Sequence, residues 1–150
     1  MSEPTQPRNT CIYGKGEMSA LIRSFDWEKT SLGPIHTWSA HLLISVNLLL
    51  DSSFPMLIWW GEDRIQFYND AYLRILGTDN SKKQLQTLGR RGEDCWPDAW
   101  PRVSELIERV LSSGESEFVE DEMVPLYRNG RMENVYCLYR NHTYAGAITA

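Results

Sequence analysis

Residues 54–77 contain several structural signals in direct succession: an apolar run, a polar turn, a second strand pattern and the start of a helix. Residues 54–60 are apolar on both faces of an extended strand, and residues 61–63 supply turn-forming side chains. Residues 64–68 then show the period-two pattern of a half-buried strand. The Asn-Asp pair that follows ends this strand and can cap a helix. The pattern predicts a two-stranded hairpin followed by a helix.

The first of these strands lacks the alternation of a strand with one solvent-facing side. Because its apolar side chains point both ways, we expect a central strand that other elements cover on both faces. The apolar surface left for the second face is an upstream helix, predicted to run to about residue 50. Its stripe, which we expect to cover the outer sheet face and to contribute to a homodimer interface, consists of Trp38, Leu42, Val46 and Leu49. The pattern leaves open whether this helix comes from the same chain or from a twofold-related partner.

The other helices are predicted from helix-breaking residues as well as from apolar periodicity. Residues 1–16 are polar and poor in apolar side chains, so we expect a flexible lead-in. A short helix is predicted over residues 18–25, and Gly-Pro then breaks the chain within residues 30–34. After a polar loop at residues 78–92, apolar residues recur at helical spacing from residue 100 to residue 111, with proline in the first turn.

A second hairpin is predicted near the C-terminal end of the chain. Residues 118–128 and 131–139 flank Asn129-Gly130, the dipeptide most typical of a two-residue hairpin turn, so the two residues that flank it should pair. Pro125 cannot donate to a ladder, and its strand is therefore expected at a sheet edge. Residues 144–150 have room for one further strand.

Several short stretches together resemble a known family. The strings FPMLIWWG, YNDAYLRILG, LGR, CWPDAW and RNGRMENVY occur in the order seen in PAS sensor modules of bacterial two-component histidine kinases. The upstream string GEMSALIRSFDWEKTSLGP is similar to the segment that precedes such modules. The matching stretches span most of residues 14–139, whereas the short connection at residues 140–143 departs from the family.

The resemblance implies an α+β chain with the PAS fold. We then expect a five-stranded antiparallel sheet flanked by helices, with an N-terminal helical extension at residues 17–52 and the PAS domain at residues 53–150. A resemblance to sensor modules further implies a signal-transducing input domain that binds a small ligand, forms a homodimer, or does both. The natural polypeptide would continue into a histidine kinase.

Composition restricts the partners and the compartment. The chain carries 15 Lys plus Arg against 20 Asp plus Glu, a net charge of −5, so nucleic acid and anionic membrane are unlikely partners. Three cysteines without metal-type spacing and a polar N-terminus are typical of a reduced, cytoplasmic chain. The longest apolar stretch, residues 42–50, is far shorter than the ~20 residues of a membrane span.

The chemistry-bearing residues argue against catalysis and against metal. Cys95 lies beside two carboxylates and far from any histidine in sequence, so a packed or surface thiol is favoured over a nucleophile. His36 and His41 are five residues apart and do not share a helical face. Flavin attachment is disfavoured because acidic residues surround Cys95. Haem is disfavoured because no histidine lies between His41 and His142. No cofactor is identified.

A ligand pocket is expected on the inner sheet face, between the sheet and the helices that begin near residues 71 and 101. Aromatic and apolar side chains converge there, although core packing explains them as well. The candidates are Phe67, Tyr72, Leu76, Trp96, Trp100, Val103, Val124, Val135, Cys137 and Tyr139. Two alternatives to a ligand-binding sensor stay open: a free-standing interaction domain without a ligand, and, more remotely, a small thiol-dependent enzyme.

Overall fold

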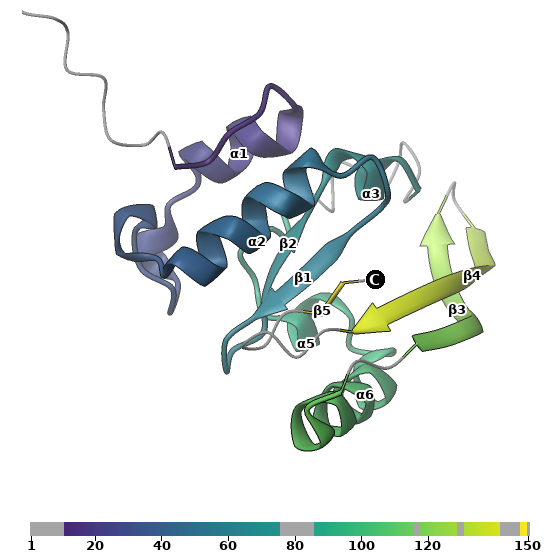
Figure 1. The fold of residues 1–150 in the computed structure, drawn as a ribbon. Coiled ribbons are helices and arrows are strands. Elements are labelled where there is room, and N and C mark those ends of the chain that lie inside the picture. The colour runs from purple at the N-terminus through teal and green to yellow at the C-terminus, as the bar shows by residue number, and fades with distance from the viewer. Residues whose placement is uncertain (1–10, 76–85, 116–117, 129–130, 142–147, 150) are drawn as a thin grey trace, which may run out of the picture.

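A computed structural model describes residues 11–75, 86–115, 118–128, 131–141 and 148–149. Within these ranges, side chains are described for residues 11–74 and 86–115. The chain mixes helices and antiparallel strands, which confirms the predicted α+β class (Figure 1).

The N-terminal helices form where the sequence predicted them. Helix α1 spans Glu17–Ser24 and helix α2 spans Ala40–Asp51, with the short 3-10 turns η1, Trp27–Lys29, and η2, Ile35–Thr37, between them. Helix α2 begins at Ser39, whose Oγ accepts from the backbone N–H of Leu42 at 3.2 Å. This bond satisfies one of the unpaired N–H groups of the first turn.

Strands β1, Leu57–Trp60, and β2, Ile65–Tyr68, form the first predicted hairpin. Its register pairs Trp60 with Ile65, Trp59 with Gln66 and Ile58 with Phe67. Directly paired residues share a face of a sheet. One face, here called the inner face, therefore carries Leu57, Trp59, Gln66 and Tyr68. The outer face carries Ile58, Trp60, Ile65 and Phe67.

Helix α2 covers the outer face, and it belongs to the same chain (Figure 1). The predicted stripe of Trp38, Leu42, Val46 and Leu49 is buried in the core cluster with the hairpin. Phe67 stacks on Trp27 with ring centroids 4.9 Å apart and meets the edge of Trp38 at 5.6 Å. The N-terminal extension thus covers the second face of β1, a strand that was predicted to be covered on both faces.

The expected flexible lead-in through residue 16 is corrected by the packing of residues 11–16. Ile12 is buried in the core cluster. Asn47 of α2 clamps the backbone beside it, accepting from the N–H of Tyr13 at 2.9 Å and donating to the carbonyl of Cys11 at 2.7 Å. Arg23 of α1 donates to the carbonyl of Ile12 at 3.1 Å. The short run Cys11-Ile12-Tyr13 within a polar stretch was too weak a signal to predict this.

Helices α3, Asp70–Ile75, α5, Gly92–Cys95, and α6, Trp100–Ser113, follow the hairpin. Helix α6 ends at Gly114, which adopts the left-handed conformation just after the apolar periodicity stops at residue 111. Helices α5 and α6 lie on the side of the hairpin opposite to α2 (Figure 1).

Strands β3, Phe118–Arg128, β4, Arg131–Asn141, and β5, Ile148–Thr149, form an antiparallel sheet in the order β3-β4-β5. Arg128 pairs with Arg131, as predicted, while the turn residues 129–130 lie outside the described residues. The strand with Pro125 is at the sheet edge, also as predicted.

The expected single five-stranded sheet is not what the described residues form. They form a two-stranded sheet and a three-stranded sheet, and β5 lies beside β1 (Figure 1). The ladder pairs of β5 go to Arg140 and Asn141 of β4. The described residues of β5 thus lie against β1 without a ladder pair to it.

Candidate functional site

The inner face of the hairpin gathers polar and aromatic side chains against α5 and α6. We call this group the inner-face cluster, and it consists of Trp59, Gln66, Tyr68, Thr87, Cys95, Trp96 and Trp100. It combines residues from β1, β2, the segment that precedes α5, the end of α5 and the start of α6.

Gln66 is the centre of this cluster. Its side chain is fully buried, and its Oε1 accepts from two indole N–H groups, that of Trp59 at 3.1 Å and that of Trp96 at 2.7 Å. Its Nε2 donates to Thr87 Oγ1 at 3.1 Å. A buried amide must be paired in this way, because an unpaired one costs free energy. Gln66 therefore links the hairpin to Thr87 and Trp96, which lie on either side of α5 in the sequence.

Glycines bring the segment that precedes α5 close to the sheet. Residues 89–92 run along the free edge of β2, where the N–H of Gly89 donates to the carbonyl of Gln66 at 3.0 Å and the N–H of Gly92 donates to that of Arg64 at 2.8 Å. A Cβ on Gly92 would lie 2.5 Å from the Trp100 ring and 2.7 Å from Trp59 Nε1. Only glycine leaves room for the two tryptophans, which meet edge to face at 5.4 Å.

Two ionisable groups lie at the other end of the cluster. Burial raises the pKa of the Tyr68 hydroxyl to about 12, opposed in part by its hydrogen bond with Thr87. Burial likewise raises the pKa of the Cys95 thiol to about 11, and the guanidinium of Arg90 offsets this only in part. Both groups are neutral at physiological pH. The neutral thiol is a poor nucleophile there.

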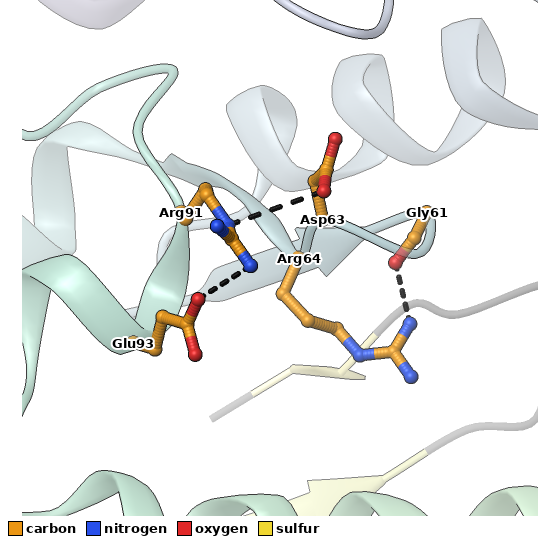
Figure 2. A network of polar contacts seen from close by, with 5 residues as sticks. All are labelled: Gly61, Asp63, Arg64, Arg91 and Glu93. Carbon is orange, nitrogen blue, oxygen red and sulfur yellow. Dashed lines mark hydrogen bonds and ion pairs between the residues drawn. The ribbon is translucent and has the colours of Figure 1, made fainter.

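A separate network of charged side chains fastens α5 to the hairpin turn (Figure 2). Arg91 lies 4.0 Å from Asp63 of the turn and forms an ion pair with Glu93 of α5. Arg64 points away from this pair and donates to the carbonyl of Gly61 (Figure 2). The paired side chains are about half exposed, so each pair contributes little to stability.

The structure brings together some of the predicted pocket residues. Trp96 and Trp100 belong to the inner-face cluster, and Tyr72 lies beside it with its ring centroid 6.0 Å from that of Tyr68. Val103 packs on the core from α6. The side chains of the other candidates lie outside the described ones: Leu76, Val124, Val135, Cys137 and Tyr139.

Phe67 is corrected as a pocket candidate. It lies on the outer face against Trp27 and Trp38, because its ladder partner is Ile58. The residue that takes its expected place on the inner face is Gln66, which was not among the predicted pocket residues. A four-residue turn at 61–64 fixes Trp60 opposite Ile65, and counting back from that pair puts Gln66 opposite Trp59.

No protein-family model matches the chain, and no curated protein matches it. Within the part of the chain that the structure describes, no group of three or more His, Cys, Asp or Glu side chains is placed to hold a metal ion. Among the described helices, none has the length and apolarity needed to cross a membrane.

Proposed function

We propose that this chain is a non-catalytic sensory module of the PAS class, the input domain of a bacterial two-component histidine kinase that continues beyond it. Two lines support this proposal: the family-like strings in order, and the succession of a helical extension, a hairpin, helices and three further antiparallel strands. The odd number of cysteines, three, is compatible with a cytoplasmic setting.

The inner-face cluster is the proposed sensing site. The observation that carries this role is the buried carbonyl of Gln66, which accepts from both Trp59 and Trp96. A ligand that touches the half-buried Trp96 or Trp100 would disturb those bonds and so reach the hairpin directly. Because the cluster offers neutral hydrogen-bonding groups and aromatic rings, its ligand would be small, non-covalent and uncharged or weakly charged.

Native mass spectrometry of the purified chain, followed by a thermal-shift screen with a metabolite panel, tests the sensing role. A compound that raises the melting temperature is then measured against two variants. Trp96→Phe removes the indole N–H that Gln66 accepts, while Trp38→Phe removes an equivalent bond to the carbonyl of Gly33 on the outer face. Affinity should fall at least about tenfold, or ~1.4 kcal/mol, in Trp96→Phe alone.

A second candidate function is an interaction module that binds no small molecule. The aromatic side chains of the cluster are also consistent with core packing. A native mass equal to that of the polypeptide, with no shift across the panel, would favour this candidate over the sensor. Rapid stoichiometric alkylation of Cys95 at neutral pH would instead revive a thiol-dependent enzyme, against the raised pKa of that thiol.

A further inference from the structure

Helix α2 is apolar on its outer side as well as on the side that packs on the sheet. Ile44 and Leu48 are 61 % and 63 % exposed, and Tyr13 beside them is 67 % exposed. Together with Leu43 and Leu50 they line an open groove of about 680 Å³ between α2 and residues 11–14. A helix that is apolar all round is normally buried on all sides.

The exposed side chains of α2 have the spacing of a coiled-coil seam. His41, Ile44, Leu48 and Asp51 follow each other at intervals of three, four and three residues, which places them on one narrow stripe. This stripe, here called the α2 seam, is opposite to the buried stripe of Leu42, Val46 and Leu49. Its ends are polar and its middle is apolar.

We infer that the α2 seam packs antiparallel on the α2 seam of a second copy of this chain. A twofold axis through the middle of the helix puts Ile44 opposite Leu48 of the partner subunit, twice, and His41 opposite Asp51 of the partner subunit, twice. The imidazole can donate to the carboxylate at each end. In the antiparallel arrangement the two helix dipoles also point in opposite directions, which is favourable.

Charge and polarity select this occupant over others. A parallel pair would put Asp51 against Asp51 of the partner subunit, and like charges in contact are unfavourable. After Met1, residues 1–10 contain only polar, charged or proline side chains, so they offer no apolar face to fill the groove. A net charge of −5 disfavours an anionic lipid surface. The predicted interface residues Trp38, Leu42, Val46 and Leu49 cannot form the contact, because they are buried in their own chain.

Sedimentation equilibrium of the full chain tests the apolar part of the seam. We expect a dimer whose dissociation constant rises at least about tenfold in Ile44→Glu and in Leu48→Glu, because each buries a carboxylate twice in the interface. Both side chains are exposed in one chain, so the melting temperature of the monomer should stay unchanged. Leu111→Glu, at a 41 % exposed position on α6, is the matched control and should leave the dimer intact.

Charge reversal tests the register independently. His41→Glu should weaken the dimer, since it faces Asp51 of the partner subunit with a like charge, and adding Asp51→Lys to that variant should restore it. The two positions are ten residues apart on one helix, so no contact within a chain can produce the rescue. A monomeric wild type, a dimer indifferent to Leu48→Glu, or a failed rescue would overturn the inference. Flotation of a monomeric chain with phosphatidylcholine vesicles that is lost in Leu48→Glu would also overturn it, because the seam would then bind lipid.

Discussion

Asn69 shows how one buried side chain can hold several backbone segments together. Its Oδ1 accepts from the N–H groups of Met56 and Tyr72, each at 3.0 Å, and its Nδ2 donates to the carbonyls of Leu49 at 3.0 Å and Phe54 at 2.7 Å. The bond to Tyr72 is the helix cap that the sequence predicted. The others could not be predicted, because they require α2 and β1 to meet at the end of β2.

Asn69→Ala should therefore destabilise the fold far more than the loss of a simple cap. It leaves backbone groups from α2, the start of β1 and α3 unpaired at the open end of the hairpin, so we expect a loss of ~3 kcal/mol in the free energy of unfolding. Ser39→Ala, which removes only the exposed cap of α2, should cost ~1 kcal/mol. Urea unfolding measures both, and equal losses would contradict the role given to Asn69.

Tyr68 and Cys95 predict how stability depends on pH. Their folded pKa values of about 12 and about 11 lie above their ordinary values of 10.0 and 9.0. Above pH 9 the unfolded chain therefore releases protons that the folded chain keeps, and stability falls as pH rises to about 12. Tyr68→Phe should lose less stability than the wild type between pH 10 and 12. Identical curves for the two proteins would show that burial does not raise the pKa of Tyr68.

At the scale of elements, the sequence predicted what elements form more reliably than which way they face. The stripe of α2, the turn at Gly61 and the stop at Gly114 are local signals, and each appears in the structure. Phe67 was placed on the wrong face and Gln66 was not named as a site residue, because polarity alone does not show that a glutamine in a strand is buried. On a strand covered twice, a glutamine opposite a tryptophan is instead a buried acceptor.

The contact between the N-terminal extension and the segment before α5 depends on Gly89. This residue has φ +74°, and a Cβ there would lie 2.6 Å from the Phe25 ring and 3.2 Å from the Trp27 ring. Gly61 has nearly the same φ, +73°, with nothing within 4 Å of its Cβ position. Gly61→Ala should cost ~1 kcal/mol of backbone strain. Gly89→Ala should cost a further ~1–3 kcal/mol of overpacking, measured as the difference in urea unfolding. Equal costs would mean that the aromatic rings move aside freely.

At the scale of the whole molecule, the extension and the hairpin share one core. Ile12, Met18, Ile22 and Trp27 are as deeply buried as the hairpin residues that they cover. Asp70 at the start of α3 also accepts from the N–H of Met18 at 3.0 Å, which ties α1 to the helix after the hairpin. The extension therefore packs with the hairpin across residue 52, where the sequence suggested a domain boundary.

Deleting residues 1–50 should accordingly expose Ile58, Trp60, Ile65 and Phe67 together, and the product should aggregate or remain unfolded. Refolding residues 53–150 with a separate fragment of residues 1–52 should restore a cooperative unfolding transition, because the break falls in an exposed loop beside Ser53. The same fragment with Trp27→Ala should fail to rescue, since it leaves a cavity against Phe67 that costs ~3–5 kcal/mol. A truncated chain that is soluble, monomeric and as stable as the full chain would instead show that residues 53–150 complete their own core.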